Sequence, residues 1–218
     1  MQLRGHDGRK ARIWHSVGDY LDDVRRAASD FAEPPILVGH SLGGLLVQKH
    51  LARHSAAGAV LMGSVPARGA FAALMRIARR HPWVVLKANL SLSLRPFIST
   101  RALVRELYLS PASPAPLVDT TMERLGNESF RMFLQVLWTR WRAPISPLPV
   151  LVLGAEHDGF FTAAEVEATA RLYGTHAEMF AMGHDMMLDT GWEKVADRID
   201  AWVREIAPMR AADTRASV

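Results

Sequence analysis

The sequence predicts an α/β protein in which a mostly parallel sheet is flanked by helices and interrupted by an inserted helical cap. Short apolar runs typical of buried strands alternate with stretches of helical periodicity, which indicates βαβ units. Between about residues 66 and 147 this alternation stops, and helix-like pieces separated by Pro, Ser and Asn contain no convincing strand. We expect a core of residues 1–65 and 148–206, a helical cap of residues 66–147, and a loose C-terminal tail of residues 207–218.

Composition narrows the class of protein. The chain has 218 residues, of which 49% are hydrophobic, as in an ordinary globular protein with one sizeable core. Its formal charge of +4 comes from scattered cations that form no nucleic-acid-binding motif, so we expect no nucleic-acid partner. The lack of cysteine excludes disulfides and thiolate sites. Without a signal peptide or an apolar run of roughly 18 residues, we expect a cytoplasmic protein with no transmembrane segment.

The first elements follow from capping and apolar patterns. Residues 16–19 have the spacing of a capping box, and apolar residues then recur at helical intervals up to Phe31. The two prolines at 34–35 end this helix. The apolar run over residues 36–38 is of the kind that is buried on both faces of a parallel sheet. A helix over residues 42–54 and a strand over residues 59–64 are expected next.

The clearest helix of the cap follows residues 127–128. Six apolar side chains fall there at i, i+3, i+4, i+7, i+8 and i+11 on one face: Phe130, Phe133, Leu134, Leu137, Trp138 and Trp141. We expect this stripe to pack the cap onto the body rather than to bind a ligand. Strands are then expected over residues 150–153 and 177–181, and capping boxes at 162–165 and 190–193 open the helices that follow them.

The motif "GHSLG", residues 39–43, places Ser41 between a predicted strand and a predicted helix, which is the setting of a nucleophile elbow. Such a turn crowds side chains, so we expect Gly39 and Gly43 to be needed for their lack of Cβ. It lifts the serine oxygen above the sheet edge and points the backbone N–H of Leu42 at the reacting carbonyl. The alternative is an N-cap serine beside flexible glycines.

A serine nucleophile needs a base and an orienting acid, which should follow in the order Ser, acid, His. Asp158 comes shortly after the strand predicted over residues 150–153, with Glu156 and His157 as competitors closer to the strand end. His184 lies in the loop before the last predicted helix. Among the nine histidines it alone combines this position with the required order.

Other histidines have simpler interpretations. His40 lies inside the elbow motif, and we expect it to pack beside the site. His157 and Asp185 could join His184 as metal ligands, but no H-x-x-x-H or similar spacing supports such a site. We therefore expect no metal.

Together these motifs resemble the α/β-hydrolase superfamily, in its serine esterase and lipase-like branch. "GHSLGG" resembles the elbow, "PVLVLGAEHD" the acid loop and "AMGHDMM" the histidine loop, and "LRGHDG" is similar to the loop after the fourth strand of that family. The resemblance covers nearly all of the chain except the cap. It implies that Ser41 is the nucleophile and His184 the general base and later acid. It also implies that Asp158 orients His184 and that the Leu42 backbone is one oxyanion donor.

The implied activity is hydrolysis of a small-molecule carboxylic ester with an apolar acyl group, through an acyl-enzyme on Ser41, without an organic cofactor or metal. A serine nucleophile argues against epoxide hydrolases and haloalkane dehalogenases, which need a carboxylate. Thioesters, lactones and C–C bonds next to carbonyls stay open. The alternative is a catalytically impaired or non-enzymatic hydrolase-like binding protein.

That family also has a segment before the "LRGHDG" motif, which supplies its first strands and the loop with the second oxyanion donor. The sequence as given starts after it, so we expect a hydrolase fold lacking its first strands, and a truncated relative or a natural start upstream of Met1. The strand over residues 36–38 would then lose a ladder neighbour, and the oxyanion hole would keep only Leu42. We expect weak activity and self-association of this chain.

Overall fold

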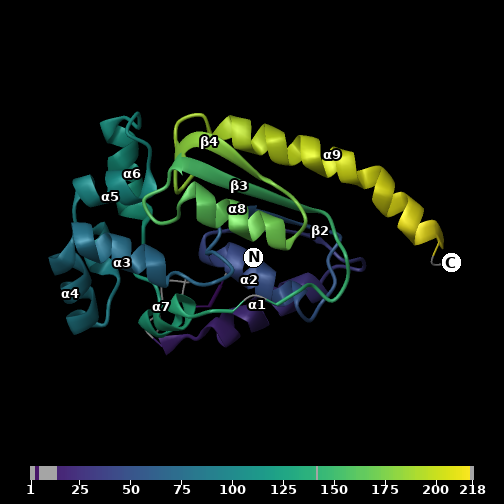
Figure 1. Cartoon of the computed structure of the whole chain (residues 1–218), viewed down its shortest axis with the longest axis horizontal. Coiled ribbons are helices and arrows are strands. Elements are labelled where there is room, and N and C mark those ends of the chain that lie inside the picture. Colours follow the sequence, from purple (N-terminus) through teal and green to yellow (C-terminus); the bar gives the residue numbers. More distant parts are fainter. Residues whose placement is uncertain (1–2, 5–13, 141, 217–218) are drawn as a thin grey trace.

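The computed structural model of this chain has four parallel strands in the order β1-β2-β3-β4. The structure describes residues 3–4, 14–140 and 142–216. Each strand pairs with the next in parallel register, and helices lie on both sides of the sheet (Figure 1). The predicted α/β class is therefore confirmed. The strands are β1 (Ile36–His40), β2 (Gly58–Met62), β3 (Val150–His157) and β4 (Ala177–Gly183).

The helices of the described part of the chain lie before, between and after the strands, in the segments where the sequence predicts helices. Two begin at the expected capping boxes. In each, the Ser or Thr hydroxyl accepts the backbone N–H of the third helical residue, and the acidic side chain of that residue accepts the backbone N–H of the Ser or Thr. They are α1 (Val17–Ser29), α2 (Leu42–Leu51), α3 (Phe71–Arg80), α4 (Pro82–Ser91), α5 (Arg101–Tyr108), α6 (Ala115–Arg124), α7 (Phe130–Leu137), α8 (Ala163–Leu172) and α9 (Trp192–Ala216), with a short 3-10 helix η2 (Arg95–Ile98).

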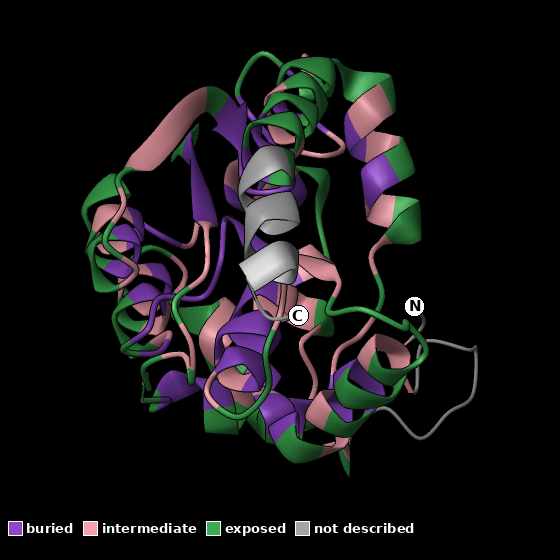
Figure 2. Cartoon of the chain, turned by 90° about the vertical axis from the view of Figure 1, so that its right-hand side faces the viewer, coloured by how far each residue is buried: buried purple, intermediate pink, exposed green. Residues whose placement is uncertain are grey.

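Two apolar layers hold the helices to the sheet. One face of β2 and β3, which includes Leu61 and Val152, packs against α1, α2 and α8. The opposite face, which includes Val60, packs against Trp202 and neighbouring residues of α9. Because successive residues of a strand point to opposite faces, β2 is buried along its whole length. Figure 2 shows the buried residues gathered on the strands and on the helix sides that face them.

β1 is less buried than the sequence predicts. In the described part of the chain it pairs with β2 alone and lies at the end of the sheet. Ile36 and Leu37 are half-buried, and Val38 is 53% exposed. The prediction of a strand buried on both faces is therefore wrong, because an edge strand is covered less fully than a central one.

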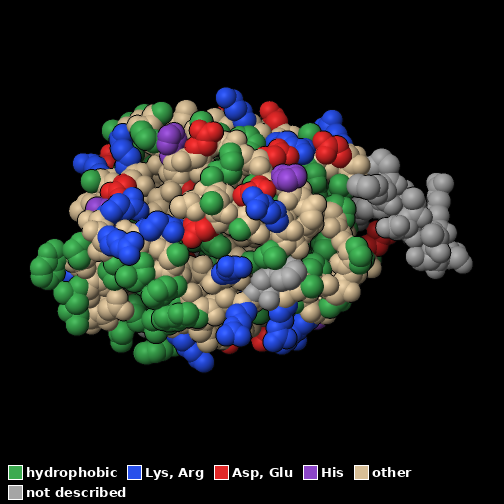
Figure 3. All heavy atoms as spheres, viewed as in Figure 1, with side chains coloured by type: hydrophobic (Ala, Val, Ile, Leu, Met, Phe, Trp, Pro, Cys, Tyr) green, Lys and Arg blue, Asp and Glu red, His purple; other side chains and the backbone are tan. Residues whose placement is uncertain are grey.

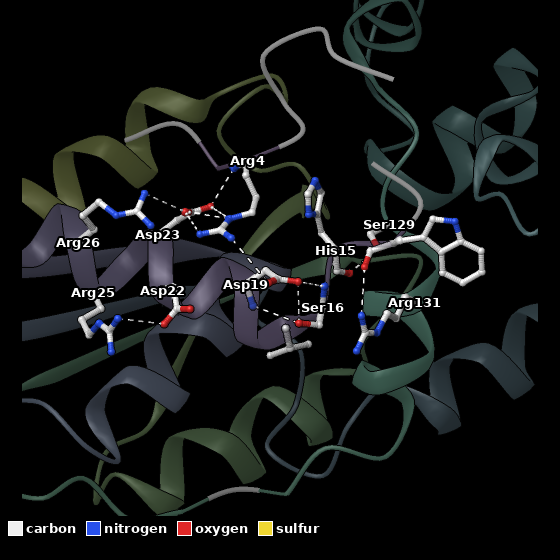
Figure 4. A network of polar contacts seen from close by, with 12 residues as sticks. Arg4, His15, Ser16, Asp19, Asp22, Asp23, Arg25, Arg26, Ser129 and Arg131 are labelled. Carbon is white, nitrogen blue, oxygen red and sulfur yellow. Dashed lines mark hydrogen bonds and ion pairs between the residues drawn. The ribbon is translucent and has the colours of Figure 1, made fainter. Parts of the chain in front are cut away.

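α1 and the residues just before it are tied to both the N-terminal segment and the cap (Figure 4). The guanidinium of Arg4 donates to the buried carboxylate of Asp23 at 2.7 Å. On the cap side, the hydroxyl of Ser129 donates to the carbonyl of His15 at 2.5 Å. The backbone N–H of Val17 also donates to the side chain of Gln135 at 2.8 Å. The bonds of Ser129 and Gln135 fix the position of α7 relative to α1.

Between β2 and β3, the described residues form helices α3 to α7 and no strand, as the sequence predicts for this segment. The stripe predicted on its clearest helix is partly wrong. α7 ends at Leu137, and Leu134 and Trp138 are exposed, whereas Met132 and Val136 are buried. Since most residues of α7 are apolar, its pattern does not determine which side packs on α1 and α3. Trp141 lies outside the described residues.

The C-terminal helix is longer than predicted. Residues 207–218 were expected to form a loose tail, but α9 continues to Ala216. This end of the chain is rich in Ala and Arg, which favour helix, and extending an existing helix avoids the cost of nucleating a new one. Across the described residues, no helix, α9 included, has both the length and the apolar character needed to cross a membrane.

Candidate active site

Ser41 occupies a sharp turn between β1 and α2. Its backbone has φ 51° and ψ −116°, a conformation that residues with a side chain rarely adopt. The backbone N–H of Ser41 donates to the carbonyl of Met62 at 3.0 Å, and its carbonyl accepts from Val65 at 3.1 Å. The end of β2 therefore holds the strained turn in place.

The two glycines of the elbow differ. A Cβ on Gly39 would lie 2.5 Å from the carbonyl oxygen of Gly43, so this position excludes any side chain. A Cβ on Gly43 would meet nothing within 4 Å. The expectation that crowding requires a glycine at both positions is thus wrong for Gly43. Crowding requires a glycine only at position 39, because a side chain there would collide with the backbone of Gly43.

Asp158 directly follows β3, which is longer than the four residues predicted for it. Its Oδ2 lies 2.8 Å from Nδ1 of His184. Its Oδ1 accepts backbone N–H groups of Phe160 at 2.7 Å and Phe161 at 2.9 Å. The side chain of Asp158 is fully buried, whereas Glu156 lies in the strand and is exposed. The surrounding loop therefore fixes the orientation of one carboxylate and not that of its competitor.

His184 lies between this acid and the serine. Its Nε2 is 2.9 Å from Oγ of Ser41. A neutral ring that donates from Nδ1 to Asp158 carries a lone pair on Nε2, which accepts the serine hydroxyl. Burial lowers the pKa of His184, but the charge of Asp158 and the hydrogen bond to it outweigh burial, so its pKa is raised. The ring is thus placed to take a proton from Ser41.

The end of α5 contacts both loops that carry these side chains. The ring of Tyr108 meets that of Phe160, two residues after Asp158, edge to face at 5.1 Å. Its carbonyl accepts the backbone N–H of Asp185, next to His184, at 2.8 Å. The cap therefore forms part of the support of the site.

A cavity of about 390 Å³ opens beside Ser41 and His184. Its walls come mainly from cap helices and are apolar: Leu74, Ile77, Phe97, Met132, Phe133 and Val136. Leu42, the first residue of α2, lines the same cavity. The backbone N–H groups of a first helical turn have no acceptor within the helix, so that of Leu42 is available to a negative oxygen held at Ser41.

Comparison with known proteins fits this arrangement. A sequence profile of the Alpha/beta hydrolase family matches residues 1–198. The chain belongs to this family. A search among proteins with curated functions gives no match.

Several solved structures resemble this α/β hydrolase. The monoacylglycerol lipase of Paleococcus ferrophilus shares 18% identity over 90% of this chain and 78% of that one, with a TM-score of 0.61. An esterase of Thermogutta terrifontis shares 16% identity over 88% of this chain and 73% of that one, with a TM-score of 0.64. The esterase RhEst1 of Rhodococcus shares 19% identity over 88% of this chain and 73% of that one, with a TM-score of 0.59. At these identities the similarity concerns the fold alone.

In this α/β hydrolase, His40 makes a more specific contact than the sequence predicts. Instead of merely packing beside the site, its Nε2 donates to the carbonyl of His184 at 3.0 Å. Burial, followed by the charge of His184, lowers the pKa of His40 to about 3, so the ring is neutral and carries this proton. Its place one residue before Ser41 was the available signal.

The sequence pattern suggested Asp185 only as a possible metal ligand and did not point to Asp189. Oδ1 of Asp185 lies 3.7 Å from Nε2 of His40, and burial raises the pKa of Asp185 to about 6. Asp189 is fully buried and accepts the backbone N–H of Gly183, next to His184, at 2.6 Å. No spacing rule in the sequence points to these contacts, because their partners come from other segments of the chain.

Within the described chain, His40, His184 and Asp185 are also the residues whose ligand atoms lie close enough, within 4.8 Å, to hold a metal ion. His157, exposed in β3, does not join them. Both nitrogens of His184 already bond to carboxylate and hydroxyl, and His40 donates from Nε2. A metal here would have to displace the hydrogen bonds that define the site.

Proposed function

We propose that this α/β hydrolase cleaves carboxylic esters through an acyl-enzyme on Ser41. The supporting observation is the continuous chain of short hydrogen bonds from Asp158 through His184 to the serine hydroxyl, at 2.8 and 2.9 Å. A hydroxyl, a neutral imidazole and a buried carboxylate in this order form the constellation for acyl transfer.

In the first half-reaction, Nε2 of His184 removes the proton of Ser41 Oγ as this oxygen attacks the ester carbonyl carbon. The carbonyl oxygen gains the negative charge and accepts the N–H of Leu42. His184, now protonated and stabilised by Asp158, gives its proton to the leaving alkoxide as the C–O bond breaks. Water then attacks the acyl-enzyme with His184 again as base, which releases the carboxylic acid and restores Ser41.

The lining of the cavity supports the proposal that the substrate is an ester with an apolar acyl chain. Apolar side chains such as Ile77, Phe97 and Val136 line the space beside Ser41 and suit an apolar acyl chain of a small-molecule ester. The same serine chemistry cleaves thioesters and lactones, so p-nitrophenyl esters from acetate to decanoate should be compared with thioester and lactone substrates. Rates that do not change with chain length would contradict a role of this cavity in acyl selection.

The deciding experiment is labelling with a fluorophosphonate probe, with the adduct mapped by mass spectrometry and p-nitrophenyl butyrate turnover measured in parallel. We expect the adduct on Ser41, and loss of both labelling and turnover in Ser41→Ala with an unchanged unfolding curve. Ser55→Ala, at an exposed serine after α2, is the matched control and should behave as wild type. An adduct on another serine would contradict the proposal, and so would absence of both labelling and turnover for every ester tested.

A further inference from the structure

α4 is apolar on both of its sides. Val84 and Val85 pack against the interior of the cap. On the other side, Trp83 is 71% exposed and Leu90 is 78% exposed, with Leu86 between them. Trp83, Leu86 and Leu90 are spaced at i, i+3 and i+7, so they lie on one face of the helix. The outer side of α4 therefore presents a surface suited to contact with something apolar.

Neighbouring helices extend this surface. α3 packs against α4 and α7, and the ring of Phe71 on α3 stacks on that of Trp138 after α7 at 5.3 Å. Figure 3 shows hydrophobic side chains gathered over the end of the molecule where Figure 1 places these helices. We name this surface the apolar cap face. Its exposed residues are Phe71, Met75, Trp83, Leu86, Leu90, Leu92, Leu134 and Trp138.

The charged side chains of residues 66–105, which include α3 and α4, are all cationic. The sequence contains no Asp or Glu over residues 34–105, whereas residues 66–105 alone contain eight Arg and Lys. Some of these cations pair with acids from other segments, as Arg76 does with Glu165. Arg79, Lys87 and Arg95 are exposed, and no carboxylate of the described chain pairs with them. They remain available to an anionic partner.

The apolar cap face also adjoins the active site. α3 directs Leu74 and Ile77 into the cavity beside Ser41, while Phe71 and Met75 of the same helix are exposed. Since a helix with its side chains is about 10 Å across, a partner that contacts Phe71 and Met75 lies within about one helix diameter of the cavity. If the proposed ester hydrolysis is correct, a docked surface that contains apolar esters would hold the substrate next to Ser41.

We propose that the apolar cap face docks this protein onto an anionic lipid surface. Trp83, Leu86 and Leu90 enter the boundary between headgroups and acyl chains, and the adjoining cations contact lipid phosphates. Aromatic and leucine side chains beside Lys and Arg are the composition of elements that lie in this boundary. A second copy of the chain fits less well, because the same cationic face on both copies would repel.

Flotation of the whole chain with vesicles tests this docking. We expect wild type to float with vesicles of phosphatidylcholine and phosphatidylglycerol, and much less with phosphatidylcholine alone or in high salt. The variant Trp83→Ser/Leu86→Ser/Leu90→Ser should bind at least about a hundredfold more weakly, because three large apolar side chains no longer insert. Its unfolding curve and its turnover of a soluble short-chain ester should match wild type.

Two controls separate the alternatives. Leu172→Ser replaces an exposed leucine on α8, outside the apolar cap face, and should leave vesicle binding unchanged. Ser41→Ala should float like wild type, so that failure of the proposed esterase chemistry is distinguished from failure of docking. Wild type that stays unbound to both kinds of vesicle would overturn the proposal. So would a triple variant that floats like wild type but converts a dimer to a monomer in lipid-free light scattering.

Discussion

Asp189 and Ser110 are joined by two hydrogen bonds: the backbone N–H of Ser110 donates to Oδ2 at 2.8 Å, and its hydroxyl donates to Oδ1 at 3.1 Å. The same carboxylate accepts the N–H of Gly183, which precedes His184. A single buried group thus links the segment after α5 to the loop that carries the proposed base.

Asp189→Asn should destabilise the protein by roughly 2–3 kcal/mol, because the amide turns N–H groups toward buried donors that need an acceptor. Urea unfolding measures this change. Asp197→Asn, at an exposed position on α9, is the matched control and should leave the free energy of unfolding within experimental error. Equal unfolding curves for the two variants would refute a linking role for Asp189.

Asp158→Asn should lower kcat for p-nitrophenyl butyrate by roughly 10⁴-fold, since an amide no longer holds the tautomer of His184 that leaves Nε2 free. Glu156→Gln should change kcat little, because this side chain is exposed and belongs to β3. If Glu156→Gln were the more damaging change, the proposed acid would be wrong.

Asp185 should make stability depend on pH. Burial raises its pKa from 3.8 to about 6, so the folded chain holds this proton more tightly than the unfolded chain. Stability is then lost as pH rises through this window, by ~3 kcal/mol for a shift of about two pKa units. Asp185→Asn should remove this loss. Urea unfolding of both proteins at pH 4 and pH 7 measures it, and parallel changes in the two would contradict the prediction.

The acidic limb of the pH–rate profile should report His184. The base has to be neutral, so kcat/KM falls as pH drops through the pKa of His184, which is raised above 6.5. Asp185 contributes to raising it. In Asp185→Asn the limb should therefore move to lower pH. A limb that stays in place or moves upward would show that Asp185 does not act on this ring.

The elbow glycines should respond differently to alanine. Gly39→Ala puts a methyl group 2.5 Å from the carbonyl oxygen of Gly43 and should cost about 1–3 kcal/mol or more of stability. Gly43→Ala has open space within α2 and should leave stability equal to or above that of wild type. Thermal unfolding of both variants decides this, and a Gly39→Ala protein as stable as wild type would disprove the close contact.

Local patterns were sufficient to locate the main elements. Capping boxes and apolar runs predicted where α1 and α8 begin and where the four strands lie, because both signals are carried by residues close in sequence. The order of Ser41, Asp158 and His184, and the position of each shortly after a predicted strand, selected three side chains that the structure brings into one hydrogen-bonded chain.

Features set by distant partners were missed. The contacts of His40 and Asp189 depend on backbone groups far away in the chain, which no local pattern encodes. The exposure of Val38 follows from its place at the sheet edge and not from its own apolar character. Similarly, the buried side of α7 follows from how α1 and α3 approach it.

The contacts of Tyr108 limit how this protein can be re-engineered. Its ring touches Phe160, after Asp158, and its carbonyl accepts the N–H of Asp185, after His184, so the last residues of α5 support the candidate active site although they lie between β2 and β3. A transplanted cap from another hydrolase would have to leave Tyr108 and Ser110 in place. The stretch from α3 to η2, which precedes this joint, carries most of the apolar cap face, and an exchange confined to it would leave Leu134 and Trp138 of that face in place.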